Sequence, residues 1–159
     1  MSILFRISYD GYGFNIEKLG VIISEYYVNL YGTSDSILNK GLDTDRFLAE
    51  WRIRNKPKNI RTKELKDWTS DALVNSTYRN KNGWLVCKKP RLNLKVKRLF
   101  VEVPSDIMSL KKADLKLARD WRLKTRLIFT SYFRKGYIIN HFLSREIDGH
   151  RRSFYVLNG

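Results

Sequence analysis

Asp45, Arg46 and Glu50 are three residues whose types and spacing could do chemistry. They lie at the start and on the polar side of residues 47–53, where apolar and polar residues alternate as in a strand with one buried face. A buried carboxylate at such a place could accept a proton from an amine substrate, and Asp45 and Glu50 are the candidates for this catalytic role. The alternative is a surface ion pair that contributes little stability, and the residues leave both interpretations open.

Three arginines, Arg119, Arg122 and Arg126, lie on one flank of a long predicted helix. Guanidinium groups donate hydrogen bonds in a fork that matches a carboxylate or a phosphate, so this flank could bind an anionic substrate group. The alternative is a solvated helix face with some pairing to Asp120 and Glu102.

The basic residues concentrate in two stretches, residues 52–66 and 79–98. The 159-residue chain has 31 Lys and Arg against 16 Asp and Glu, a net charge of +15, and such a charge attracts phosphate groups. The stretches could follow a nucleic-acid backbone, with Trp68 and Trp84 as stacking surfaces. Both tryptophans fall in the apolar phase of their segments. This favours the alternative, in which the basic faces are solvated and the tryptophans lie in the core beneath them.

The elements that must position these residues predict an α+β fold with a largely antiparallel sheet. Residues 106–135 have an apolar stripe typical of one long helix that covers a face of the sheet. Asp148-Gly149 is a pair typical of a type I′ turn and predicts a C-terminal β-hairpin. A second helix is expected over residues 62–78. Strands are expected at residues 3–7, 21–31, 47–53, 84–87, 92–96, 99–103, 137–146 and 151–157.

The length and the hydrophobic content of 43% predict one packed domain over residues 1–159. It divides into a helix–strand segment (1–55), a basic connecting region (56–98) and a strand–helix–hairpin unit (99–159). Cys87 is the only cysteine and there are two histidines, so no metal site is predicted. No apolar run approaches membrane-spanning length and no signal-peptide pattern is present, so we expect a cytoplasmic protein that does not enter membranes.

A series of short motifs runs through the chain: Glu17-Lys18-Leu19-Gly20, Tyr31-Gly32, Gly41-Leu42, Asp45-Arg46, Glu50-Trp51, Val103-Pro104-Ser105-Asp106, and Trp121-Arg122 followed by Arg126 and Phe129. The series resembles the C-terminal portion of a little-characterised branch of predicted acetyltransferases in the Gcn5-related N-acetyltransferase (GNAT) superfamily. The resemblance implies transfer of an acyl group from acetyl-CoA or another acyl-CoA to an amine. The substrate-binding residues that it implies are Arg46, Arg122, Arg126 and Tyr31.

The sequence departs from the family pattern where acyl-CoA would bind. The family holds the pyrophosphate on a Gly-rich turn before a helix, because bare backbone N–H groups must approach the phosphates. The only Gly-x-Gly, at residues 11–13, lacks the preceding Arg or Gln, and the turn at residues 104–106 has no glycine and carries an acid. The tyrosine that many members use as general acid would fall at Ile16, which cannot donate a proton. No cofactor-binding residue is therefore predicted.

Three functional hypotheses follow. The chain is a GNAT-like acyl-CoA-dependent N-acyltransferase without the pyrophosphate loop. Alternatively, it is a non-catalytic remnant or accessory subunit, which forms a homodimer or needs a partner that supplies the N-terminal half of the GNAT fold. The third hypothesis is a basic nucleic-acid-binding protein, which the net charge suggests.

Overall fold

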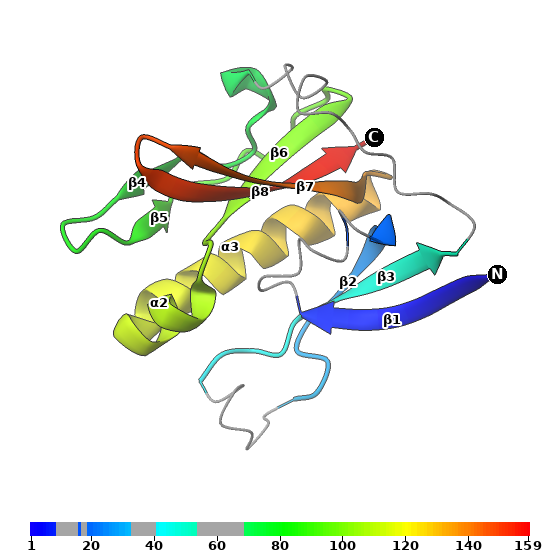
Figure 1. Ribbon diagram of the computed structural model, residues 1–159, viewed down its shortest axis with the longest axis horizontal. Helices are drawn as coiled ribbons and strands as arrows, with labels where there is room; N and C mark the ends of the chain where they lie inside the picture. Colours follow the sequence, from blue (N-terminus) through cyan, green and yellow to red (C-terminus); the bar gives the residue numbers. More distant parts are fainter. Residues whose placement is uncertain (9–15, 17–18, 33–40, 54–68) are drawn as a thin grey trace.

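The computed structural model describes residues 1–8, 16, 19–32, 41–53 and 69–159 (Figure 1). Its main feature is a six-stranded antiparallel sheet with the strand order β1-β3-β2-β7-β8-β6. These strands are β1 Ser2–Ser8, β2 Ile22–Tyr27, β3 Arg46–Arg52, β6 Arg98–Val103, β7 Ile138–Ile147 and β8 His150–Asn158. The helices are α2 Ile107–Ala113 and α3 Leu115–Arg134, and α3 packs along one face of the sheet. The predicted α+β class is confirmed.

The strand β3 lies between β1 and β2, and its side chains alternate between two environments. Phe47 and Ala49 are fully buried in the main core, whereas Leu48 points to the opposite face of the sheet. The predicted strand with one buried face is therefore confirmed. The strand expected over residues 21–31 is shorter than predicted, because the chain leaves β2 after Tyr27 and turns at Asn29, which has a positive φ of 44°.

The single helix predicted over residues 106–135 is wrong at one position: Asp114 separates α2 from α3. Its backbone is not helical, and its carboxylate accepts a hydrogen bond from the Leu117 N–H at 2.9 Å. Its own N–H donates to the Leu110 carbonyl oxygen at 2.7 Å and so completes α2. Aspartate is unfavourable inside a helix but favourable at its start, where the carboxylate accepts a hydrogen bond from a backbone N–H that has no partner in the helix. Asp114 therefore ends α2 and begins α3.

The C-terminal hairpin is confirmed, with β8 inserted between β7 and β6. Asp148 and Gly149 have positive φ angles of 53° and 74°, as a type I′ turn requires. The pairing of β7 with β8 shifts register between Ile139 and His141, which indicates a bulge.

The helix predicted over residues 62–78 is not formed in the described part of that range, and residues 62–68 lie outside it. The chain makes the 3-10 turn η1 Ser70–Ala72 and then the hairpin strands β4 Thr77–Arg79 and β5 Leu85–Cys87. The reason is tertiary, because this segment pairs with the edge of β6. Val74 N–H donates to the Phe100 carbonyl oxygen at 2.8 Å, and the Asn75 side chain bonds both the N–H and the carbonyl oxygen of Glu102.

The strand predicted at residues 92–96 is also wrong, since the structure has no strand between β5 and β6. Leu92 and Leu94 still pack against the main core, which accounts for the alternating pattern in the sequence. That core joins α3 to the sheet through the buried side chains of Ile128, Phe129 and Tyr132. Among the helices of the described ranges, none has the length and apolar character needed to cross a membrane.

Candidate functional site

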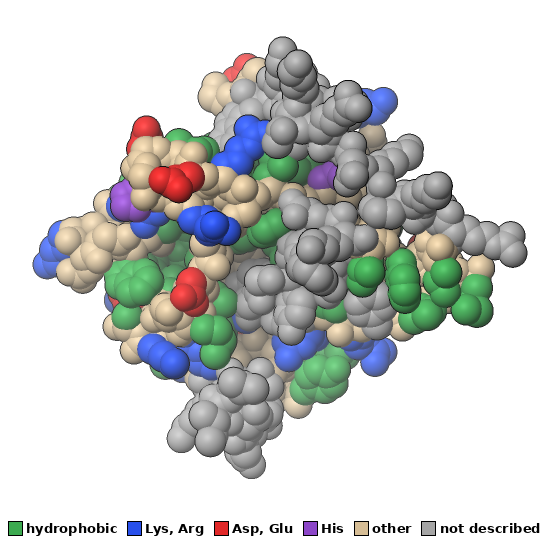
Figure 2. Space-filling model, in the orientation of Figure 1, with side chains coloured by type: hydrophobic (Ala, Val, Ile, Leu, Met, Phe, Trp, Pro, Cys, Tyr) green, Lys and Arg blue, Asp and Glu red, His purple; other side chains and the backbone are tan. Residues whose placement is uncertain are grey.

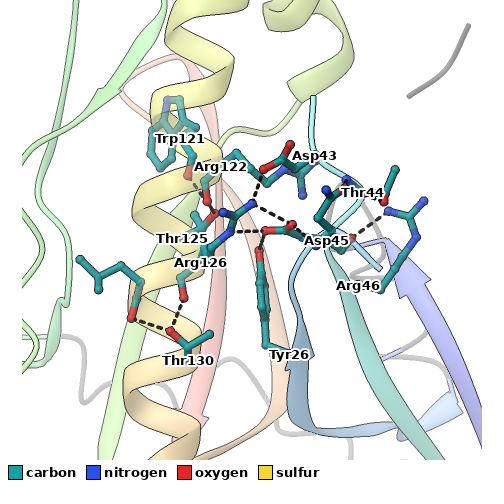
Figure 3. Close-up of polar contacts among 12 residues, drawn as sticks. Tyr26, Asp43, Thr44, Asp45, Arg46, Trp121, Arg122, Thr125, Arg126 and Thr130 are labelled. Carbon is teal, nitrogen blue, oxygen red and sulfur yellow. Dashed lines mark hydrogen bonds and ion pairs between the residues drawn. The ribbon is translucent and has the colours of Figure 1, made fainter. Parts of the chain in front are cut away.

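Asp45 immediately precedes β3 and is fully buried beside α3 (Figure 3). Tyr26 Oη donates to its Oδ2 at 2.6 Å, and the Asn29 backbone N–H donates to its Oδ1 at 2.9 Å. Arg126 donates from Nε to Oδ2 at 2.9 Å and from Nη2 to Oδ1 at 3.0 Å, which makes a bidentate pair. Both carboxylate oxygens are therefore engaged by two donors each.

Arg126 is held by two carboxylates. Besides the pair with Asp45, its Nη2 donates to Asp43 Oδ2 at 2.6 Å. The hydrogen bond to Asp45 raises the pKa of Arg126 above its ordinary value; burial opposes this effect and Asp43 adds to it. We call this arrangement the Asp45–Arg126 clamp. It favours the ion-pair interpretation of Asp45, because a general base would have to accept a proton on an oxygen already bonded to a cation.

The clamp fixes the turn after β2. The Asn29 N–H is bonded to Asp45, and the Tyr31 N–H donates to Thr44 Oγ1 at 3.0 Å. Leu30 N–H donates to the Thr44 carbonyl oxygen at 3.0 Å. Three consecutive residues of this turn, 29–31, are thereby tied to the residues that lead into β3.

Tyr31 and Arg46, two of the predicted substrate-binding residues, lie together. The Arg46 guanidinium lies over the Tyr31 ring, 5.4 Å from its centroid, and its Nη1 donates to the Asp45 carbonyl oxygen at 2.8 Å. Tyr31 is 57% exposed to solvent. The pair is therefore an exposed cation–aromatic contact directly beside the clamp.

Glu50, the second catalytic candidate, does not join this group. Its carboxylate accepts hydrogen bonds from Arg52 at 2.9 and 3.2 Å, and these bonds lower the pKa of Glu50 below its usual range. Glu50 lies opposite Leu4 of β1 and Ile22 of β2, four residues along β3 from Arg46. The structure thus separates the two carboxylates that sequence reasoning placed in one role.

The three arginines on one flank of α3 have different surroundings. Arg126 is in the clamp, Arg122 is buried, and Arg119 Nε donates to the Gly41 carbonyl oxygen at 2.9 Å. The two acids offered as their partners pair elsewhere: Asp120 with Lys124 at 2.7 Å, and Glu102 with Arg152 at 2.6 Å. Arg119 and Arg126 thus contact different partners, a backbone carbonyl oxygen and two carboxylates.

A groove of about 530 Å³ lies on the face of β1, β3 and β2 opposite the main core. Its lining residues are Leu4, Arg6, Tyr27, Tyr31 and Leu48. Sequence reasoning missed it, although the alternation in β3 already placed Leu48 on the outer face. The missing information was the pairing, which sets Arg6 of β1 opposite Leu48 and Tyr27 of β2 opposite Arg46.

The helix N-termini carry their own acids. The Asp106 carboxylate accepts hydrogen bonds from Ser109 N–H at 2.9 Å and Ser109 Oγ at 2.6 Å, and these bonds lower the pKa of Asp106. Asp114 caps α3 in the same way. A carboxylate occupies each position where an anionic phosphate would approach. Within the described ranges, no cluster of three or more His, Cys, Asp or Glu side chains is placed to hold a metal ion.

Comparison of the chain with protein-family models, with curated proteins and with solved structures finds no match. The acetyltransferase resemblance therefore stays a prediction based on short motifs.

Proposed function

We propose that this protein binds nucleic acid through the phosphate backbone, and that the basic strap, residues 88–98, is the main contact surface. The strap contains six Lys and Arg and no acid: Lys88, Lys89, Arg91, Lys95, Lys97 and Arg98. All of these except Arg98 are exposed, and Arg98 is half-buried. Clustered cations without nearby acid in the same segment release counterions from a polyphosphate when it binds.

The single observation that carries the proposal is that the backbone of the strap is hydrogen-bonded to the rest of the protein along its length. Tyr132 Oη donates to the Arg91 carbonyl oxygen at 2.6 Å, and Tyr137 Oη donates to that of Val96 at 2.8 Å. Gly159 N–H donates to the Lys97 carbonyl oxygen at 2.9 Å. The exposed lysines of the strap therefore stand on a backbone that is already ordered, and binding loses little backbone entropy. The two arginines also contact the protein, since Arg91 donates to the Ser70 and Leu73 carbonyl oxygens and Arg98 to Asn158 Oδ1.

The predicted stacking surfaces need revision within this proposal. Trp84 is partly buried and packs against the cluster around Cys87 and Trp121, so it offers little open ring surface. Trp68 lies outside the described residues. The strap contacts are therefore taken to be electrostatic and independent of sequence.

Two observations weigh against the acyltransferase hypothesis. Asp45 is engaged by Arg126 on both oxygens, and the N-termini of both described helices are capped by aspartates. A remnant or accessory subunit is compatible with both observations, but no contact among the described residues favours a particular partner.

Fluorescence anisotropy with a labelled oligonucleotide between about 50 and 200 mM salt tests the proposal. The variant Lys95→Gln/Lys97→Gln should weaken binding and reduce the steepness of the salt dependence by about 1.4 for a single strand, because two phosphate contacts are lost. The matched control is Lys81→Gln/Lys112→Gln, which removes two exposed charges outside the strap.

Equal losses in the two double variants would show that net charge, not the strap, drives binding. Absence of binding at the lowest salt would reject the proposal. A parallel titration with acetyl-CoA should show no binding tighter than millimolar; a micromolar dissociation constant would instead support the acyltransferase hypothesis.

A further inference from the structure

The groove on β1, β3 and β2 combines open apolar surface with cations. Leu4 is 63% exposed at one side, and Tyr31 forms the other side. Arg6 lies over the Tyr27 ring at 5.8 Å from its centroid, as Arg46 lies over Tyr31. Figure 2 shows hydrophobic side chains gathered over the N-terminal part of β1. Near the C-terminal end of β1, the same view shows a hydrophobic side chain between Lys or Arg side chains.

The two tyrosines are held in place before any ligand arrives. Tyr27 Oη donates to Glu25 Oε2 at 2.7 Å, and this bond raises the pKa of the Tyr27 phenol above its ordinary value. Tyr31 belongs to the turn that the Asp45–Arg126 clamp fixes to the start of β3. The clamp therefore acts as a positioning device for one wall of the groove.

Aromatic rings with arginines over them match the two parts of a nucleotide. Any of the nucleobases can stack on a tyrosine ring, so this contact does not depend on the nucleic-acid sequence. An arginine can donate hydrogen bonds to the adjoining phosphate. A duplex cannot use such a groove, because its bases are already stacked on each other. A neutral apolar peptide would contact Leu4 and Leu48 but would bring no anion to Arg6 and Arg46.

We propose that this groove is a stacking site for unpaired bases of a single-stranded nucleic acid. The inference rests on the proposed function and adds a preference to it. The strap binds phosphates of any strand, and the groove selects strands whose bases are free.

The test compares an oligothymidine with a duplex of equal phosphate count by anisotropy at fixed salt. The variant Tyr31→Ala should weaken binding of the single strand about ten-fold and that of the duplex less than about two-fold. Tyr31→Phe keeps the ring and should bind both probes within about two-fold of the unmodified protein. Tyr78→Ala is the control outside the groove, since Tyr78 is also half exposed and has Lys88 over its ring at 5.9 Å. Because Lys88 belongs to the strap, any loss in Tyr78→Ala should be equal for the two probes.

The outcomes separate the two proposals. If Tyr31→Ala weakens both probes equally, or neither, or no more than Tyr78→Ala does, the groove does not stack bases, whatever the strap variants do. If the strap variants leave the salt dependence unchanged while Tyr31→Ala still weakens only the single strand, the strap proposal fails and the stacking site stands. Circular dichroism of each variant checks that it is folded, and Tyr31→Phe separates loss of the ring from loss of the hydroxyl.

Discussion

The substitution Asp45→Asn removes the negative charge of the clamp while it keeps the shape of the side chain. An amide has one acceptor oxygen where the carboxylate has two, so the bidentate pair with Arg126 is lost together with one of the other two bonds. Removal of one partner of a buried ion pair costs about 3–5 kcal/mol. Arg126 is 21% exposed and retains Asp43, so we expect a loss at the lower limit, about 3 kcal/mol.

Urea unfolding followed by tryptophan fluorescence measures this loss. With a denaturant dependence of about 2 kcal/mol per M, the midpoint should fall by about 1.5 M. Asp43→Asn is the control: Asp43 is 50% exposed, so its loss should cost less than about 1 kcal/mol. The double variant Asp45→Asn/Arg126→Met should be more stable than Asp45→Asn alone, because it leaves no cation without its buried partner.

A midpoint for Asp45→Asn within experimental error of the unmodified protein would refute this account of the clamp. So would a double variant whose loss of stability equals the sum of the losses in Asp45→Asn and Arg126→Met, because the two charges would then not act on each other.

Two further predictions concern stability elsewhere in the fold. Gly149→Ala should lower the free energy of unfolding by about 1 kcal/mol in the same urea assay, because Gly149 has a φ of +74°, which strains a residue that has a Cβ. A Cβ at Gly149 would meet no atom within 4 Å, so backbone strain is the only cost. An unchanged free energy of unfolding would mean that this turn adopts another conformation in solution. Burial raises the pKa of the Cys87 thiol in the folded protein above its ordinary value of 9.0. The folded protein therefore favours the neutral thiol, and the stability that this contributes is fully present below the pKa of the unfolded chain. It is lost as the pH rises through the higher pKa of the folded protein. The urea midpoint should therefore fall further above about pH 9 than it does in Cys87→Ala, and identical pH profiles would contradict the prediction.

The parts of the fold that follow from local patterns were predicted from the sequence. Alternation identified β3, and Asp148-Gly149 identified the turn of the C-terminal hairpin. The break at Asp114 is also local, since an aspartate at a helix start is a recognised capping signal. It was missed because the apolar stripe continues across it, and periodicity alone does not register a change of backbone at one residue.

The errors between residues 69 and 98 have a different cause. There the edge of β6 competes with local structure: Asn75 pairs with the Glu102 backbone, and the strap bonds to Tyr132 and Tyr137. These partners are remote in the chain, so helical or strand-like spacing in residues 69–98 could not reveal them.

The candidate site shows the same division. The sequence by itself determined the residue types, the strand expected over residues 47–53 and the common flank of Arg122 and Arg126 on one helix. Only the tertiary structure decided that Arg126 reaches Asp45 across 81 residues of chain and that Arg122 is buried. The reason is that periodicity records which face of an element is apolar, whereas the pairing of charges and the walls of a groove depend on how separate elements meet.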